Sequence, residues 1–299
     1  MDKVAVIGAS GLVGKEVVSL LKNSKYAPQQ IDSLGRQKKY TFDTYDTVFL
    51  CTPSKVSAVL APLAALGDTC VIDLSSAHRR SDAAFLFHPT NPINSTKKIF
   101  AIPNCVASIL LTVLAPLHRI NPILRIFGAT YQAASGAGKK GIEELTERKK
   151  PDIFPHPYEY NLFLHEKNES EEEKIIEETK LLLQSPKLKM HIRAIRVPVL
   201  RAHSMILNVT FTHPLSEKEA YKILSKENLI TYSDSPTPKM AENSQSVFYG
   251  PIRQDFSLKN SLDFFICGDQ LLRGAALTAV ECYDLLCEKS IIKPKLSLI

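Results

Sequence analysis

The stretch Val4-Ala5-Val6-Ile7-Gly8-Ala9-Ser10-Gly11-Leu12-Val13-Gly14 predicts a buried strand, a glycine-rich turn and then a helix over Gly14 to Lys22. A glycine-rich turn is informative in this context, between a strand and a helix. The GxxGxxG spacing is a variant of the dinucleotide-binding fingerprint. There the glycines permit a tight turn, close approach of backbone to a pyrophosphate, and close helix–strand packing. The helix N-terminus then supplies N–H groups to the phosphate. We therefore expect Gly8, Gly11 and Gly14 to serve a nucleotide cofactor. The alternative is a glycine-rich turn that binds nothing.

The rest of the first half alternates short apolar strands with helical patterns. Alternation of this kind predicts a parallel, doubly wound sheet. The expected strands are Thr47–Thr52, Cys70–Leu74 and Ile99–Ile102, and a helix, Val56–Leu66, lies between the first two.

The second half has longer extended runs rich in β-branched residues, which indicate a mostly antiparallel sheet with helices between its strands. The expected strands are Ile123–Tyr131, Met190–Leu200, Met205–Thr212, Ser246–Ile252 and Leu262–Cys267, the expected helices are Lys139–Lys149, Glu171–Leu183 and Glu217–Lys226, and Ser233–Lys239 is a Pro/Ser-rich loop. A last helix, Gln270–Glu288, is expected to return to the first domain.

These patterns predict an α/β protein of two domains, which its 299 residues can accommodate. One is a Rossmann-type cofactor domain with a parallel sheet, over residues 1–104 and 270–299. The other is an α+β domain with a mostly antiparallel sheet, over residues 105–269.

Composition excludes several classes of protein. The chain is 44% hydrophobic and 23% charged, as in ordinary globular enzymes, and no apolar run is long enough to span a membrane. Its first residues lack the pattern of a signal peptide, so we expect a cytoplasmic protein. The six cysteines form no CxxC pair and no zinc-like spacing with histidine, so no structural metal is expected. The net charge of +6 is dispersed and not interleaved with aromatic residues, which argues against nucleic acid and fits small anionic ligands.

The segment Ser33-Leu34-Gly35-Arg36-Gln37-Lys38-Lys39 bears on the choice of cofactor. An NAD site usually has a carboxylate at the end of the second strand, for the ribose hydroxyls. Arg36 and the lysines after it fit a 2′-phosphate instead, which favours NADPH. Asp32 keeps NAD open, and a solvated basic turn is the simpler alternative.

The segment Ile102-Pro103-Asn104-Cys105-Val106-Ala107-Ser108 places a thiol immediately before an apolar run, Val106 to Leu117, that predicts a buried helix. The N-terminus of a helix favours thiolate over thiol, and a thiolate attacks carbonyl carbon. Cys105 is therefore a candidate nucleophile. The alternative is a small buried hydrophobic residue, as most free cysteines are.

Two further segments hold polar residues next to predicted strands. The stretch Tyr131-Gln132-Ala133-Ala134-Ser135-Gly136-Ala137-Gly138 ends a strand in a glycine-rich loop. The stretch Arg196-Val197-Pro198-Val199-Leu200-Arg201-Ala202-His203-Ser204 places an arginine and a histidine seven residues apart, on opposite faces if the strand is regular. Pro198 argues that the strand is interrupted, because proline cannot donate to a sheet.

Together these motifs resemble those of the aspartate-β-semialdehyde dehydrogenases, and the resemblance spans nearly the whole chain. The Asn-Cys motif, the Gln-x-x-Ser-Gly-Ala-Gly segment and the Arg-Val-(x5)-His-Ser segment occur in the family's order. The resemblance implies that Cys105 is the nucleophile of a thioester intermediate, His203 the general acid/base and Gln132 a positioning residue. A histidine suits general acid/base catalysis because its ordinary pKa lies near the working pH.

The resemblance also implies the binding residues and makes the α+β domain the catalytic and dimerisation domain. Arg196 takes the substrate carboxylate, Arg79 and Lys174 the phosphate, and Glu171 the amino group, with Asn104 also at the substrate. The implied cofactor contacts are Ser10, Leu12, Val13, Ser135, Gly136 and Gln270. Four of the implied site residues have a simpler interpretation. His203 is then a histidine within a strand whose hydrogen bonds are all made, and Arg196 is part of a structural ion pair. Glu171 and Lys174 then lie on a solvated helix face.

The implied reaction is the NADPH-dependent reduction of L-aspartyl 4-phosphate to L-aspartate 4-semialdehyde, in the biosynthesis of lysine through diaminopimelate, threonine and methionine. The implied assembly is a homodimer or homotetramer. Departures from the family pattern, chiefly a shortened region between Arg36 and Asp46, bear on cofactor affinity. Two alternatives stay open: an N-acetyl-γ-glutamyl-phosphate reductase, which typically has glycine where this chain has Asn104, and a non-catalytic nucleotide-binding protein of the same fold.

Overall fold

A computed structural model describes residues 2–37, 40–147, 152–165 and 171–292. The chain divides into two compact units, Met1–Pro103 with Ala275–Ile299 and Asn104–Gly274. These limits differ from the predicted domain boundaries by one residue at the first and five at the second. Lys38 and Lys39, which the sequence associates with a 2′-phosphate, lie outside the described residues.

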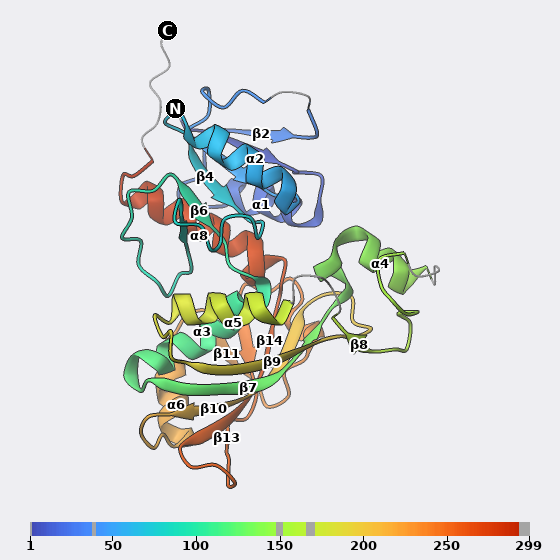
Figure 1. The fold of residues 1–299 in the computed structure, drawn as a ribbon, viewed down its shortest axis with the longest axis vertical. Coiled ribbons are helices and arrows are strands. Elements are labelled where there is room, and N and C mark those ends of the chain that lie inside the picture. The colour runs from blue at the N-terminus through green and yellow to red at the C-terminus, as the bar shows by residue number, and fades with distance from the viewer. Residues whose placement is uncertain (1, 38–39, 148–151, 166–170, 293–299) are drawn as a thin grey trace. The chain divides into compact units, whose positions relative to one another are not determined.

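The first unit is built on a six-stranded sheet with the order β2-β1-β3-β4-β6-β5 (Figure 1). Every pairing in it is parallel, which confirms the Rossmann-type fold class. The strands are β1 (Lys3–Ile7), β2 (Gln30–Leu34), β3 (Thr47–Leu50), β4 (Cys70–Asp73), β5 (Ala84–Leu86) and β6 (Ile99–Ala101), and the helices are α1 (Leu12–Lys22), α2 (Ser54–Ala65) and α8 (Leu277–Glu288).

Residues of β1 alternate between two cores, one on each face of this sheet. Val4 and Val6 pack into a cluster with Val17 of α1 and Tyr283 of α8. Ala5 and Ile7 pack into a second cluster that includes residues of α2. Because helices cover both faces, the central strands must be largely apolar, whereas the edge strand β2 carries polar residues. This is the physical reason for the short continuous apolar runs of the first half.

The second unit is built on an eight-stranded sheet with the order β11-β12-β14-β10-β7-β9-β8, and β13 pairs with β14 off this path. Only β7–β9 and β11–β12 are parallel among the described pairings, which confirms a mostly antiparallel sheet. The strands are β7 (Ile123–Gln132), β8 (Phe163–Leu164), β9 (Lys189–Arg196), β10 (His203–Phe211), β11 (Ile230–Tyr232), β12 (Val247–Tyr249), β13 (Arg253–Gln254) and β14 (Ser261–Gly268).

Helices cover one face of this second sheet. The central one, α3 (Cys105–Ile120), is buried from Val106 to Leu117 and contacts β7, β12 and β14. Figure 1 shows α3 and α5 (Glu171–Leu182) running along the sheet, and α6 (Glu217–Leu224) also packs on α3. Two short helices, α4 (Gly138–Thr146) and α7 (Pro238–Ala241), complete the unit.

Several predicted elements were too long, and two of them overran by four residues or more at one end. The strand predicted over Met190–Leu200 ends at Arg196, because the residues that follow bond the chain after β7: the carbonyls of Val199 and Leu200 accept the N–H groups of Ala134 and Ser135. The helix predicted from Gln270 begins in the α-form only at Leu277, after a π-helical turn over Leu272–Ala276.

Other predictions missed an element or an element boundary. α1 begins at Leu12, two residues before the predicted Gly14. The predicted loop over Ser233–Lys239 contains the start of α7, which Thr237 caps. Strands β2, β5, β8, β11 and β13 were not predicted as separate elements, because each has five residues or fewer and lacks a clear alternating pattern. None of the helices in the described ranges has both the length and the apolarity that a membrane crossing requires.

Gly14 tests the packing of α1 on the glycine-rich turn. A Cβ atom at this position would lie 2.3 Å from the carbonyl oxygen of Gly8 and 2.7 Å from Cα of Ala9. Since backbone cannot yield as a flexible side chain does, we expect Gly14→Ala to lower the free energy of unfolding by about 1–3 kcal/mol. Gly35→Ala is the matched control, because a Cβ atom there meets nothing within 4 Å. Equal melting temperatures for the two variants would contradict this packing.

Candidate active site

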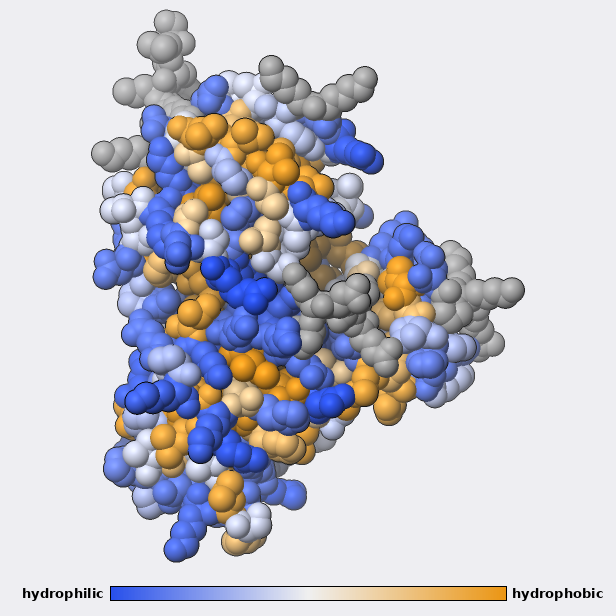
Figure 2. All heavy atoms as spheres, viewed as in Figure 1, coloured by the Kyte–Doolittle hydropathy of each residue, from blue (hydrophilic) through white to orange (hydrophobic). Residues whose placement is uncertain are grey.

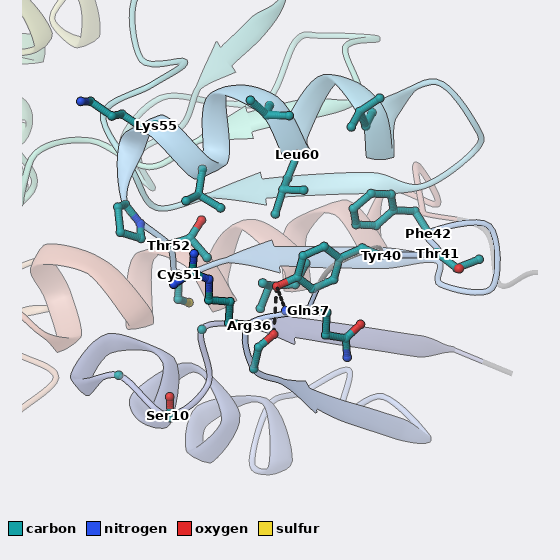
Figure 3. Close-up of a pocket in the computed structure, with 18 of the residues that line it drawn as sticks. Ser10, Arg36, Gln37, Tyr40, Thr41, Phe42, Cys51, Thr52, Lys55 and Leu60 are labelled. Atoms are coloured by element: carbon teal, nitrogen blue, oxygen red, sulfur yellow. Dashed lines mark hydrogen bonds between the residues drawn. The ribbon is translucent and has the colours of Figure 1, made fainter.

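A cavity of about 1330 Å³ lies in the first unit, at the carboxyl ends of its central strands (Figure 3). Gly8 and Cys51, which follow β1 and β3, line it together with Gly35 after β2. Strand β2 pairs with one side of β1, and β3 pairs with its other side. The direction in which strands are added therefore reverses at β1, and the cavity lies at this topological switch point. Open α/β sheets bind ligands at that point.

The glycine-rich turn presents backbone to this cavity. Gly8 has a φ of +85°, and a Cβ atom there would lie 2.3 Å from the carbonyl oxygen of Cys51. Gly11 is the N-cap of α1 and no side chain caps that helix, so the N–H groups of its first turn suit a phosphate. Ser10 and Gly11 line the cavity, whereas Leu12, Val13 and Gly14 form the first helical turn. These residues fit a dinucleotide.

The far part of the cavity is apolar on one side and aromatic on the other. Val59, Leu63 and Leu66 are exposed on or just after α2 and line the cavity, and Figure 2 shows an apolar patch over that helix. Opposite, Tyr40 stacks on Phe42 with ring centroids 6.1 Å apart. The hydroxyl of Tyr40 donates to the carbonyl of Gly35 at 2.9 Å, which holds the loop of the shortened region (Figure 3).

Arg36 is exposed and lines the cavity, while Asp32 does not line it. The carboxylate of Asp32 accepts hydrogen bonds from Gln30 and Tyr45 and pairs with Lys3. The hydrogen bond from Gln30 contributes most to lowering the pKa of Asp32. Since this acid is engaged elsewhere, the side chain available near the end of β2 is cationic, as a 2′-phosphate requires.

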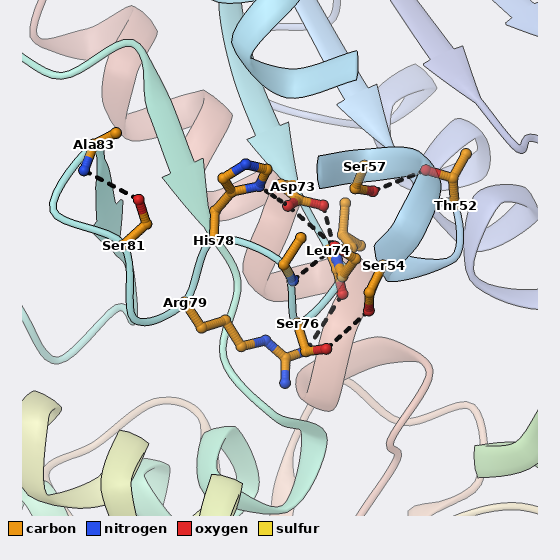
Figure 4. Close-up of polar contacts among 12 residues, drawn as sticks. Thr52, Ser54, Ser57, Asp73, Leu74, Ser76, His78, Arg79, Ser81 and Ala83 are labelled. Carbon is orange, nitrogen blue, oxygen red and sulfur yellow. Dashed lines mark hydrogen bonds and ion pairs between the residues drawn. The ribbon is translucent and has the colours of Figure 1, made fainter. Parts of the chain in front are cut away.

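Asp73, at the end of β4, organises the loop that bears Arg79 (Figure 4). Its buried carboxylate accepts the N–H and hydroxyl of Ser75 and a hydrogen bond from Nδ1 of His78 at 2.8 Å. Arg79 then donates from Nε to the carbonyl of Ile102 at 2.7 Å. Its guanidinium is thereby held at the carboxyl edge of the parallel sheet.

Cys105 is the first residue of α3 in the second unit, and Asn104 caps that helix. The Asn104 side-chain oxygen accepts the N–H of Val106 at 2.9 Å, its amide donates to Glu171 at 2.7 Å, and its backbone N–H donates to Glu178 at 2.5 Å. The cap and α5 therefore fix the residue before the half-buried thiol. Lys174 lies on α5, one turn beyond Glu171.

Two neighbours of Cys105 escaped the sequence analysis. Gly274 packs so closely that its Cβ atom would lie 2.8 Å from Cβ of Cys105, and no sequence pattern marks it. Glu178 does leave a signal, since it is an acid in the buried stripe of α5 between Ile175 and Leu182.

The other cysteines are poor nucleophiles. Burial raises the pKa of Cys51 and of Cys70 to about 12, and the pKa of Cys267 and of Cys287 to about 11. The pKa of Cys282 is raised well above its ordinary value for the same reason. Because the thiolate is the reactive species, these five thiols are expected to be inert near neutral pH.

Gln132, Arg196 and His203 meet at one edge of the second sheet. Gln132 ends β7 and Arg196 ends the parallel β9, where the two are register partners. β10 runs antiparallel to β7 and starts with His203, so its first residue lies at the same edge. A Cβ atom on Gly136 would lie 3.0 Å from Cε1 of His203 and 3.1 Å from a terminal nitrogen of Arg196. Only a glycine lets the loop after β7 approach both side chains.

Arg196 is a buried cation held by neutral groups. Arg196 is only 6% exposed. Its guanidinium donates to the carbonyl of Ala133 at 3.0 Å and to Nε2 of His165 at 2.6 Å. The ring of Phe154 lies 5.6 Å from its Cζ atom. Within the described ranges none of its hydrogen bonds goes to a carboxylate. A buried guanidinium without an anionic partner is costly, so this site is suited to an anionic ligand.

His203 is completely buried, and its Nδ1 accepts the N–H of Ala133 at 3.0 Å. The neutral ring therefore has its proton on Nε2, which makes no hydrogen bond within the described residues. Burial is the main cause that holds the pKa of His203 well below its usual value, and the positive charge of Arg196 adds to it. The environment of His203 therefore lowers its pKa from the ordinary value on which the sequence argument relied. The ring is a neutral hydrogen-bond donor.

Ser135 and Gln270, expected at the cofactor, are hydrogen-bonded to each other, with the Gln270 amide donating to the Ser135 hydroxyl. The Gln270 oxygen accepts the N–H of Ala202 at 2.8 Å, next to His203. Both residues are buried. The structure therefore places this pair beside the edge that holds Gly136.

Family models match a large part of each unit. Residues 25–99 match the model of a semialdehyde dehydrogenase NAD binding domain, and residues 114–273 that of a semialdehyde dehydrogenase dimerisation domain. The chain is 32% identical to an aspartate-semialdehyde dehydrogenase of Prochlorococcus marinus over 96% of each chain. It is 33% identical to one of Rickettsia bellii over 93% of this chain and 95% of the relative.

Solved structures share the fold. The aspartate semialdehyde dehydrogenase II of Vibrio cholerae, complexed with ASA, has a TM-score of 0.92 at 24% identity, over 96% of this chain and 98% of that one. The enzyme of Candida albicans, solved with NADP, has a TM-score of 0.77 at 20% identity, over 98% and 100%.

The fold and the matched models define an oxidoreductase with an NAD(P)-binding domain and a dimerisation domain. The chain belongs to the aspartate-semialdehyde dehydrogenase family.

Gly136 tests whether the edge of the second sheet is a working site. A Cβ atom there would displace His203 and Arg196 by a few tenths of an ångström. We expect Gly136→Ala to lower kcat/KM by about tenfold to a hundredfold, because small misplacements of reacting groups are costly. The melting temperature should change little. Full activity in this variant would show that the tight approach is irrelevant to catalysis.

His203 tests the effect of burial on its pKa. Since the folded-state pKa lies well below 6.5, the ring should stay neutral as the pH falls through 6.5, and its ¹³C-histidine NMR signal should not titrate there. The unfolded chain does take up that proton, so His203 should make the fold less stable as pH falls through this range. An NMR midpoint near 6.5 for His203 would contradict the neutral-donor role.

Proposed function

We propose that this chain catalyses the NADPH-dependent reductive dephosphorylation of L-aspartyl 4-phosphate to L-aspartate 4-semialdehyde, in the biosynthesis of lysine through diaminopimelate, threonine and methionine. The strongest support comes from the edge of the second sheet, where the guanidinium of Arg196 and Nε2 of His203 both lie next to Gly136. Neither group has a hydrogen bond to an anion among the described contacts. That arrangement provides a carboxylate site beside a donor for a carbonyl oxygen. The relatives named aspartate-semialdehyde dehydrogenase favour this substrate over N-acetylglutamyl phosphate and over a role without catalysis.

The binding roles follow from charge and placement. Arg196 takes the substrate α-carboxylate through its planar fork. Glu171, at the start of α5 and bonded to Asn104, takes the amino group. We assign the phosphate to Lys174 and Arg79, as the resemblance implies. Gln132, buried in register with Arg196, orients the acyl group.

The covalent step belongs to Cys105. Its thiolate attacks the acyl carbon, the S–C bond forms, and the C–O bond to phosphate breaks, which leaves a thioester. His203 donates a hydrogen bond from Nε2 to the acyl oxygen as negative charge develops there. NADPH, when bound, supplies the hydride that reduces the thioester carbon. The S–C bond then breaks, Cys105 leaves as thiolate, and the aldehyde is released.

The cofactor is held by the first unit. Gly8, Ser10 and Gly11 bring backbone to the pyrophosphate, and the first turn of α1, Leu12 to Gly14, adds its N–H groups. Arg36 takes the 2′-phosphate, which makes NADPH the preferred cofactor over NADH. Ser135, Gly136 and Gln270 complete the cofactor contacts.

A homodimer forms, in our proposal, through the sheet face of the second unit that the helices leave open. Phe127 and Ile206 are each 47% exposed on that face, and Phe127 stacks on His191 of the neighbouring strand at 5.5 Å. An apolar centre with a polar surround is typical of such interfaces. The match to a dimerisation domain supports this choice, and a tetramer is the alternative. We place the protein in the cytoplasm, where its six free thiols stay reduced.

The reverse reaction tests the activity directly. Aspartate semialdehyde should reduce NADP in a phosphate-dependent manner, more efficiently than it reduces NAD. Cys105→Ala should abolish turnover while NADPH binding, followed by its fluorescence, persists. Cys287→Ala, which removes a thiol with a pKa of about 11, is the matched control and should stay active. Turnover by Cys105→Ala would exclude the thioester route, and phosphate-independent reduction would exclude an acyl phosphate.

A further inference from the structure

His165 lies beside Arg196 without belonging to any of the sequence motifs. It directly follows β8, whose Phe163 and Leu164 pair antiparallel with Arg196 and Ile195. Its backbone N–H donates to the carbonyl of Ala194 at 2.8 Å. Backbone pairing through β8 and at His165 itself therefore places this residue beside β9, where its ring contacts the guanidinium of Arg196.

The contact between the two side chains has only one possible direction. A guanidinium has donors and no acceptor, so Nε2 of His165, 2.6 Å from a terminal nitrogen of Arg196, accepts with its lone pair. The ring is then neutral, with its proton on Nδ1. The other terminal nitrogen donates to the carbonyl of Ala133. Each terminal nitrogen of the guanidinium thus donates to one neutral acceptor, and the ring of Phe154 lies near the guanidinium.

From this geometry we propose that His165 is the positioning residue of the carboxylate site: it orients the Arg196 guanidinium for the substrate α-carboxylate without adding a negative charge of its own. The proposal rests on the proposed function of Arg196. An acidic residue at position 165 would make an equally good hydrogen bond. It would also neutralise the cation and compete with the substrate carboxylate. A neutral imidazole provides the orientation alone.

The test compares three substitutions at position 165 in the full-length enzyme, with KM and kcat measured for aspartate semialdehyde at saturating NADP and phosphate. His165→Phe keeps the ring and removes the acceptor, so KM should rise by about tenfold to a hundredfold while kcat changes less than threefold, since a hydrogen bond to a charged group is lost. His165→Gln restores a neutral acceptor and should bring KM back to within about threefold of the parent. His165→Glu should have the highest KM of the three.

The matched control is His156→Phe, because His156 is exposed on the same excursion of the chain and its ring packs on Phe163 at 5.9 Å. Its KM should equal that of the parent enzyme. A substrate without the α-carboxylate, 3-aminopropanal, provides a second control, since the parent and His165→Phe should use it equally poorly.

Two results would overturn the proposal: an unchanged KM in His165→Phe, or a KM in His165→Glu no higher than that of His165→Gln. Failure of the proposed function is distinguishable, because the parent enzyme itself would then not oxidise aspartate semialdehyde. In that case crystal structures of His165→Phe and His165→Gln decide the matter. The guanidinium of Arg196 should leave the Ala133 carbonyl in the first and keep that bond in the second, and an unmoved guanidinium in His165→Phe would refute the positioning role.

Discussion

The buried guanidinium of Arg196 is the constraint on which the site depends. Burying a cation is costly unless charge or several hydrogen bonds compensate it. Here its hydrogen bonds go to a carbonyl and an imidazole, an aromatic ring lies near it, and the charge of Glu171 acts on it without a hydrogen bond among the described contacts. Such a site stays incompletely satisfied until an anion arrives. The same charge also helps to keep His203 neutral. The charge of Arg196 therefore affects both the carboxylate site and the protonation of the histidine.

The fold meets this constraint by ending three strands at one edge. Parallel β7 and β9 end at Gln132 and Arg196, and antiparallel β10 begins at His203. The chain after β9 then bonds the chain after β7, which brings Gly136 against both side chains. The glycine has no Cβ atom to prevent that approach.

The nucleophile depends on a second set of contacts within the same unit. Asn104 caps α3 and is itself held by two carboxylates of α5, Glu171 and Glu178. The position of Cys105 is therefore determined by a neighbouring helix as well as by its own. In the first unit, by contrast, the nucleotide site is mostly backbone: a glycine-rich turn, an uncapped helix N-terminus and a cavity at the switch point.

The sequence by itself determined what is local. Apolar periodicity specified the two kinds of sheet, glycine spacing specified the turn after β1, and an Asn-Cys pair before an apolar run specified a helix N-terminus. It could not show that Asp32 is engaged by Gln30 and Tyr45, that Glu178 holds the cap, or that His165 faces Arg196. It also could not show that burial lowers the pKa of His203. Apart from the Gln30–Asp32 hydrogen bond, those features join residues 13 to 74 positions apart or depend on burial. Both are set only when the strands and helices pack together.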